Sequence, residues 1–365
     1  MTSRILIAIV ALVAGCASTP GDALREPGDR IAVVVAPPLR GEFVVRDRAL
    51  SMMGTDVKII VVAKEGAVDV SSLDAALDAA VVEFARVEDL MTDWRPSPLE
   101  TLNQSAGLGP RVVPKELARF IVRAAEISEL TEGAFDATYG AVGQLWRFRG
   151  EPELPDPAEV AAALAFVGAQ QVVVDLERNT VTLPAGFRIG LGGIAKGYGV
   201  DRAMRVLIDH GICNALVNAG GDMKILGEYC GAPWEVAIRH PRSARKPGGA
   251  RAAMAVLRLS NTCVVTSGDY ERFFTIDGVR YHHILDPRTG YPATAAMSAT
   301  VLAPDAAFAD ALATALCILG PERGLAIVRK LPRVEALIID LAGDAHASPG
   351  LEGFFLPATA GQEAR

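Results

Sequence analysis

The order of strand and helix patterns along the chain limits the fold more than any other feature of the sequence. The two kinds of pattern follow one another without strict strand–helix–strand alternation and without an internal repeat. A parallel sheet with crossover helices needs that alternation, and a solenoid needs a repeat. The sequence therefore predicts an α+β fold in a single domain, with helices packed on a mixed sheet.

Individual elements are predicted from apolar spacing. Strands are expected at residues 57–62, 171–175, 180–183, 215–218, 234–238, 255–259, 262–266, 273–276, 298–302 and 336–339. Ser71 and Ser72 are expected to cap the first long helix, Pro114 to open the second, and Gly320-Pro321 to end one that spans residues 306–319. A further helix is expected to begin after the glycine-rich turn at residues 191–193. The first helix carries an apolar stripe at helical spacing: Leu73, Ala76, Leu77, Ala80, Phe84, Val87 and Met91.

The first sixteen residues have the pattern of an export signal. Arg4 precedes an apolar run over residues 5–13, which is about half of the ~20 residues that a membrane-spanning helix needs. Residues 13–16 (VAGC) resemble the lipobox of bacterial lipoproteins, in which Cys16 would become the lipid-modified N-terminus. The alternative is an ordinary signal peptide with an incidental cysteine. We expect an exported protein that is lipid-anchored to a bacterial membrane and faces the periplasm.

Composition shifts suggest the domain boundaries. Residues 1–15 are assigned to the signal peptide and residues 16–50, rich in Pro, Gly and Arg, to a tether. Residues 51–345 are assigned to the folded domain and residues 346–365 to a C-terminal tail. The basic stretch at residues 242–251 is expected to be a solvated loop or, as the alternative, a partner-binding patch.

Charge and cysteine usage exclude several classes. Lys and Arg number 36 against 43 Asp and Glu, and this acidic balance argues against a nucleic-acid partner. The cysteines after Cys16 form no Cys-x-x-Cys pair and have no His at zinc-ligand spacing, so we predict no zinc site. Cys213, Cys263 and Cys317 lie in apolar runs and are expected in the core, and no disulfide is predicted.

Residues 190–198 (GLGGIAKGY) form a glycine-rich turn at the start of a predicted helix. Glycines there let backbone N–H groups approach a phosphate, whose charge the helix dipole favours. Lys196 adds a mobile positive charge in the same turn. The spacing is not that of a Walker A loop, and taken alone the pattern also suits a plain tight turn.

Asp310 and Thr314 lie four residues apart on a predicted helix, so their side chains share one face. Their neighbours are nearly all Ala and Leu, where a lone carboxylate is costly. A hard cation such as Mg²⁺, which prefers oxygen ligands, would offset that cost. The alternative is an Asp paired with a buried Arg or with a backbone donor.

Two adjacent histidines, His282 and His283, precede an Asp-Pro-Arg-Thr-Gly turn at residues 286–290. A histidine that enters a polar turn could act as a general base near neutral pH. The alternative is a hairpin with exposed histidines.

Together these segments resemble the ApbE-type FAD:protein FMN transferase family over residues 52–340. The matching stretches, in the family's order, are residues 53–55, 134–136, 191–198, 218–222, 267–272, 283–292, 304–305 and 309–315. The resemblance implies an ApbE-like fold and Mg²⁺-dependent transfer of the FMN moiety of FAD to a Thr or Ser hydroxyl of a target protein. A phosphoester bond would form and AMP would be released. The expected acceptor is an exported protein such as a subunit of a membrane redox complex.

The resemblance also implies a phosphate and metal site. The side chains of Asp310 and Thr314 and the carbonyl of Gly193 would bind Mg²⁺. Lys196 would lie beside the phosphates. His283 would take the proton of the acceptor hydroxyl, with His282 as the alternative.

The flavin and nucleotide contacts are implied in the same way. Met53 and Trp94 would line the flavin ring, although Trp94 could instead be a core residue that closes the first long helix. The segment Ala134-Phe135-Asp136 would contact the nucleotide, with Asp136 accepting hydrogen bonds from ring or ribose donors.

One position departs from the family pattern. The family commonly has an Asp that contacts FAD immediately before Leu-Gly-Gly, and this chain has Gly190 there. Asp175 or Asp222 could compensate. Two other functions therefore stay open: hydrolysis of FAD to FMN and AMP, and FAD binding by a lipoprotein without catalysis.

Overall fold

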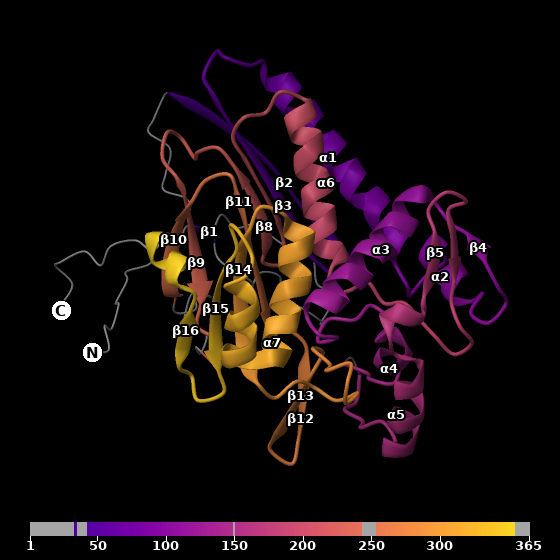
Figure 1. The fold of residues 1–365 in the computed structure, drawn as a ribbon. Coiled ribbons are helices and arrows are strands. Elements are labelled where there is room, and N and C mark those ends of the chain that lie inside the picture. Colours follow the sequence, from indigo (N-terminus) through magenta and orange to yellow (C-terminus); the bar gives the residue numbers. More distant parts are fainter. Residues whose placement is uncertain (1–32, 35–41, 149, 243–252, 355–365) are drawn as a thin grey trace.

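A sheet of eight strands forms the centre of the molecule (Figure 1), in the order β16-β15-β14-β11-β8-β7-β3-β2. The computed structural model describes residues 33–34, 42–148, 150–242 and 253–354. Neighbouring strands of this sheet are antiparallel at every pairing. The predicted α+β fold with packed helices is confirmed, but the central sheet is antiparallel and not mixed as expected.

The strands of the central sheet are β2 (Phe43–Met52), β3 (Thr55–Lys64), β7 (Ala215–Ala219), β8 (Asp222–Leu226), β11 (Thr262–Gly268), β14 (Ala296–Ala303), β15 (Glu335–Asp340) and β16 (Ala345–Ala347). Strand β3 is rich in β-branched residues and is buried along most of its length, as expected for an inner strand. Strand β2 pairs with it from Phe43 to Met52.

Both boundaries predicted for the folded domain need correction. Strand β2 begins at Phe43, inside the stretch assigned to the tether. Charged residues interrupt its apolar pattern because it is a half-exposed edge strand. Strand β16 and the 3₁₀ helix η3 (Pro349–Phe354) lie in the stretch assigned to the tail, and Leu351 is fully buried. The predicted signal peptide, Cys16 and most of the predicted tether lie outside the described residues, as does nearly all of the basic stretch.

Three long helices cover one face of the sheet (Figure 1): α1 (Val70–Met91), α6 (Ala195–Asp209) and α7 (Ala306–Val328). The whole predicted apolar stripe of α1 is buried. Asp69, rather than Ser71, occupies the N-cap position of α1, because helical geometry already begins at Val70. Gly320 interrupts α7 with non-helical backbone angles, as the Gly-Pro pair predicted, and a further helical segment continues to Val328.

Helix α7 is long and apolar enough to span a membrane by length and composition, and 67% of its most apolar window is buried inside this fold. Its surroundings on the sheet and against α6 identify it as a core helix. The opposite face of the central sheet packs on a smaller sheet of β1 (Val33–Val34), β9 (Trp234–Arg239) and β10 (Ala253–Leu259).

The cysteines within the described residues are free thiols. Cys263 and Cys317 are buried as predicted, and Cys230 is buried too. Cys213 is exposed, so its predicted place in the core is wrong. It lies in the turn between α6 and β7, where the apolar run continues but the chain is at the surface.

The remaining elements lie beside the layer of α1, α6 and α7, at the right and bottom of Figure 1. They are α2 (Pro98–Asn103), α3 (Lys115–Leu130), α4 (Gly140–Gly143), α5 (Pro157–Ala163), η1 (Leu164–Phe166), η2 (Ala169–Gln171), the strands β4 (Arg111–Val112), β5 (Val173–Asp175) and β6 (Thr180–Thr182), and the hairpin β12 (Phe273–Ile276) and β13 (Val279–His282). The loops between them complete the site.

Candidate active site

A pocket of about 510 Å³ lies where the first turns of α6 and α7 meet the loops that follow α1, α3 and β13. Ten residues implied by the sequence resemblance line it: Met53, Trp94, Ala134, Phe135, Asp136, Gly193, Lys196, His283, Asp310 and Thr314. They come from segments as far apart in the chain as the β2–β3 turn and α7. The fold therefore brings together the residues that the sequence analysis selected one motif at a time.

A buried lysine stands at the centre of the pocket. The Nζ of Lys196 lies 3.1 Å from both carboxylate oxygens of Asp310, and it also donates to Asp222. Both carboxylate side chains are almost fully buried. Burial by itself would lower the pKa of Lys196, but the attraction of the two carboxylates outweighs it and raises that pKa above its ordinary value. Lys196 is therefore a permanent cation.

The close approach of α6 and α7 explains why a glycine follows Lys196. A Cβ atom at Gly197 would lie 2.2 Å from the carbonyl oxygen of Ala306, so no side chain fits there. The N–H of Gly197 donates to Asp310 Oδ2 at 3.1 Å. Contact between the two helix starts thus places the lysine and the carboxylate face to face.

The alternative raised for Asp310 holds in part, because its charge is met by a cation and a backbone donor, although the cation is Lys196 and not an Arg. The ion pair of Asp310 with Lys196 is compatible with a role of Asp310 as a metal ligand. A carboxylate offers about four acceptor positions, and Lys196 and Gly197 occupy three of those on Asp310.

Further oxygens stand next to Asp310. Thr314 Oγ1 lies 3.3 Å from Ser267 Oγ, and a Cβ atom at Gly193 would be 3.5 Å from Thr314 Oγ1. The donors are all oxygens, which Mg²⁺ prefers. Within the described ranges, no group of three or more His, Cys, Asp or Glu side chains could hold a metal ion. The residues fit Mg²⁺ if hydroxyl, backbone and substrate oxygens complete its ligand set.

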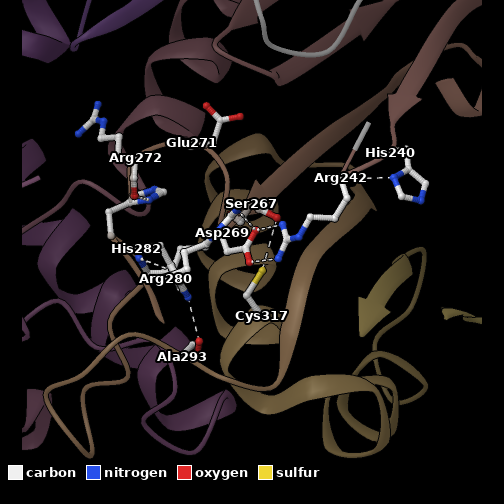
Figure 2. A network of polar contacts seen from close by, with 12 residues as sticks. His240, Arg242, Ser267, Asp269, Glu271, Arg272, Arg280, His282, Ala293 and Cys317 are labelled. Atoms are coloured by element: carbon white, nitrogen blue, oxygen red, sulfur yellow. Dashed lines mark hydrogen bonds and ion pairs between the residues drawn. The ribbon is translucent and has the colours of Figure 1, made fainter. Parts of the chain in front are cut away.

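The two histidines are placed differently. His282 is buried, its Nδ1 accepts from the N–H of Ile284 and its Nε2 lies 2.8 Å from the carbonyl oxygen of Ala293. Figure 2 shows this ring directed at Ala293. His283 lines the pocket, and its Nδ1 lies 3.3 Å from the carbonyl oxygen of Arg272.

A carbonyl can only accept, so Nδ1 of His283 carries the hydrogen and Nε2 keeps its lone pair. Burial and then the nearby Arg272 lower the pKa of His283 to about 3. The ring is therefore neutral at neutral pH.

Asp136 does not match the role implied for it. Its Oδ1 accepts from the backbone and side chain of Thr138, and its Oδ2 accepts from Ser128 and from the N–H of Ala169. These four hydrogen bonds saturate a carboxylate that is 5% exposed. Asp136 shapes the loop beside Ala134 and Phe135, and it is not available to accept from a nucleotide.

Trp94 is 67% exposed at the rim of the pocket, so the alternative of a core tryptophan is wrong. Met53 lines the same pocket from the tight turn between β2 and β3, with a positive φ of 49°. An apolar turn residue and an exposed indole could together receive a flat ring.

An ion pair between the buried Asp269 and the more exposed Arg242 supports the segment that follows β11. Figure 2 shows Arg242 facing Asp269, with nitrogen–oxygen distances of 2.6 and 2.5 Å, and Arg280 lies 3.5 Å from the same carboxylate. Asp269 does not line the pocket, whereas Ser267 and Arg272 on either side of it do. The pair thus holds this segment against the site without taking part in it.

Sequence reasoning missed several residues that line the pocket, among them Asp93, Tyr139 and Arg188. Burial raises the pKa of Asp93, which adjoins Trp94. Closeness in the sequence to a candidate site residue could have indicated Tyr139, since it follows Asp136 by three positions. Of the two carboxylates proposed to compensate for Gly190, Asp222 lines the pocket and Asp175 does not.

Known proteins match both the sequence and the fold. The ApbE family model matches residues 53–338. The FAD:protein FMN transferase of Treponema pallidum (strain Nichols) is 36% identical over an alignment of 323 residues, and the alignment covers 83% of this chain and 87% of that protein. The FAD:protein FMN transferase of Klebsiella pneumoniae (strain 342) is 35% identical over an alignment of 298 residues, which covers 80% of this chain and 91% of that protein.

Two solved structures share the fold. The ApbE protein of Thermotoga maritima has a TM-score of 0.77 at 32% identity, covering 86% of this chain and 100% of that one. The flavin transferase ApbE of Vibrio cholerae has a TM-score of 0.73 at 31% identity, covering 86% and 99%. The resemblance predicted from the motifs is confirmed, and the chain belongs to the ApbE family.

Proposed function

We propose that this protein transfers the FMN moiety of FAD to a Thr or Ser hydroxyl of a target protein and releases AMP. One observation carries the proposal: the cationic Lys196, held between two buried carboxylates, faces a pocket bordered by a glycine-rich turn. The two carboxylates outweigh the single charge of Lys196, so with a divalent cation held there the site could bind a diphosphate and neutralise the charge that develops on it. Relatives named FAD:protein FMN transferase support the same reaction.

The phosphate end of the pocket would bind the diphosphate of FAD. Lys196 supplies a positive charge beside Gly192 and Gly193 of the glycine-rich turn, which line the same pocket. Asp310, Thr314 and the carbonyl of Gly193 would hold Mg²⁺, which when bound supplies further positive charge to the phosphate oxygens. Catalysis of phosphoryl transfer rests chiefly on such alignment and charge neutralisation.

In the proposed reaction, the acceptor hydroxyl oxygen forms a bond to the phosphorus of the FMN half. The bond from that phosphorus to the bridging oxygen breaks, and AMP leaves with the bridging oxygen. The hydroxyl proton passes to Nε2 of His283, which faces the pocket as a neutral acceptor. His282 has both ring nitrogens engaged with the backbone and is the poorer candidate.

We also propose that the protein is exported and anchored through a lipid on Cys16, with an acceptor that belongs to a membrane redox complex. The signal-like residues 1–16 support this location. Membrane fractionation of cells that express the wild type or Cys16→Ser tests it. We expect the variant to leave the membrane fraction; equal membrane content would contradict the anchor.

One incubation tests the activity. Purified protein, FAD and Mg²⁺ are mixed with an acceptor domain that carries a single Thr, and flavin fluorescence is recorded in a denaturing gel. We expect a fluorescent acceptor and release of AMP. The same acceptor with Thr→Val is the control and should stay dark.

The other outcomes identify the two alternatives. Free FMN and AMP without a labelled acceptor would indicate hydrolysis, in which water replaces the protein hydroxyl. FAD that is bound but unchanged would indicate a carrier. Omission of Mg²⁺ or addition of EDTA tests the metal, since we expect the label to disappear.

A further inference from the structure

Tyr139 lies against the glycine-rich turn at Gly190. A Cβ atom at Gly190 would be 3.2 Å from Cε1 of Tyr139, and a Cβ atom at Gly143 would be 3.0 Å from Cε2. Both distances are shorter than ordinary van der Waals contact. The two glycines therefore leave the space in which the aromatic ring lies.

Backbone pairing fixes this ring in place. The N–H of Gly190 donates to the carbonyl oxygen of Ala137 at 2.8 Å, and Tyr139 forms a parallel bridge with Arg188. A Cβ atom at Gly140 would lie 2.7 Å from the carbonyl oxygen of Arg188, so the two segments touch. The start of α4 and the approach to the glycine-rich turn thus form one unit.

The hydroxyl of Tyr139 is directed along the glycine-rich turn. A Cβ atom at Gly192 would lie 3.5 Å from this oxygen, and both residues line the pocket. Among the described residues, the hydroxyl has no hydrogen-bond partner. A phenol can donate one hydrogen bond, and burial raises the pKa of Tyr139 to about 12, so the proton stays on the oxygen at neutral pH.

We infer that Tyr139 is a substrate-positioning residue whose hydroxyl donates a hydrogen bond to an acceptor oxygen of bound FAD beside Gly192. The inference rests on the proposed function, because it takes FAD as the ligand. Tyr139 and Gly192 line the same pocket as Lys196 and Asp310. A phosphate oxygen only accepts, so a neutral phenol, which can donate, suits it.

The first experiment compares the wild type with Tyr139→Phe, which keeps the ring and removes the hydroxyl. We expect the Kd for FAD, measured by quenching of flavin fluorescence, and the KM for FAD to rise about tenfold. The kcat of transfer and the Tm should change little. Tyr229→Phe is the matched control, since Tyr229 packs beside Trp234 on the opposite face of the sheet and should behave as the wild type.

The second experiment is a double-mutant cycle of Gly190→Ala and Tyr139→Phe. The added methyl group should displace the ring and weaken FAD binding on its own. It should weaken binding far less once the hydroxyl is absent, because the contact it disturbs is already lost. Strict additivity would contradict the coupling between the two residues.

Unchanged Kd and KM in Tyr139→Phe would overturn the inference, as would a fall in kcat alone. Failure of the proposed function is seen separately in the wild type. A wild type that binds FAD but labels no acceptor would refute transfer, while the Kd comparison would still decide the role of Tyr139. A wild type that binds no FAD would refute both.

Discussion

Two parts of the pocket lining come from different kinds of structure: packed helices and strands in one part, turns and loops in the other. At the phosphate end, Lys196, Asp222 and Asp310 project from the starts of α6 and β8 and from the second turn of α7, and both carboxylates are buried. Elsewhere in the lining, Met53 lies in a tight turn and Trp94 is 67% exposed in a loop. We infer that packed core elements fix the positions of the charged groups, whereas the loops would bind the flavin ring.

The contrast has a physical cause. Electrostatic stabilisation requires that charges keep their positions as the reaction proceeds, and contact between packed helices provides that rigidity. A flat ring gains most of its binding free energy from area and stacking, which tolerate small shifts. Substitutions in the two parts should therefore differ in what they change.

The largest effect is expected at Asp310. Asp310→Asn keeps the shape and removes the charge that faces Lys196, so transfer should fall about 10²- to 10³-fold. The rate of acceptor labelling measures it. Asp269→Asn is the matched control, because Asp269 is also buried and paired with a cation but does not line the pocket. Equal loss of transfer in both variants would contradict the special role of the phosphate end.

The next effect concerns stability. In Gly197→Ala the new methyl group would meet the carbonyl oxygen of Ala306 at 2.2 Å, so the free energy of unfolding should fall by about 1–3 kcal/mol. Urea denaturation measures it. Gly192→Ala in the same turn meets only ordinary contact and should stay within about 0.5 kcal/mol of the wild type. If both variants lost similar free energy of unfolding, the contact between α6 and α7 could not be the reason that residue 197 must be a glycine.

A smaller effect is expected in the exposed part. Trp94→Ala should raise the KM for FAD about three- to tenfold through lost stacking and leave kcat almost unchanged. Steady-state labelling at varied FAD separates the two constants. Leu108→Ala, at another exposed apolar residue outside the pocket, should change neither. A fall in kcat with an unchanged KM would place Trp94 with the chemistry instead.

The smallest effect concerns the pH dependence of transfer. An ordinary His gains a proton below about pH 6.5, but the pKa of His283 is lowered to about 3, so its Nε2 keeps the lone pair down to acidic pH. Between pH 5.5 and 8 we expect no loss of labelling due to this group. An inflection near pH 6.5 that His283→Gln removes would contradict this assignment.

The same shift affects stability. In the unfolded chain this His binds a proton below pH 6.5, whereas in the fold it stays neutral until about pH 3. The free energy of unfolding should therefore fall as the pH decreases through this window. Denaturation at several pH values should show a shallower fall for His283→Gln.

Local patterns predicted the parts of the site that lie within one turn or one helix. Asp310 and Thr314 were linked by a four-residue spacing, and both line the pocket. Partnerships across the chain were not accessible in this way: that Lys196 lies between Asp222 and Asp310 depends on how α6, β8 and α7 meet. The saturation of Asp136 was hidden for the same reason, because one of its donors, the N–H of Ala169, lies 33 residues further along the chain.

The edges of the domain were also missed for a physical reason. Strand β2 is half exposed, so its burial pattern is weaker than that of its partner β3. Its identity as a strand follows from ten residues of pairing with β3, which is a property of the assembled sheet.

By itself, the sequence determined the α+β class, most of the elements and the family, because periodicity and short motifs are properties of neighbouring residues. Only the tertiary structure decided which charges face one another, which carboxylate is already satisfied and where the ring of Tyr139 fits. These depend on contacts between residues distant in the chain, and such contacts exist only once the helices and strands have packed.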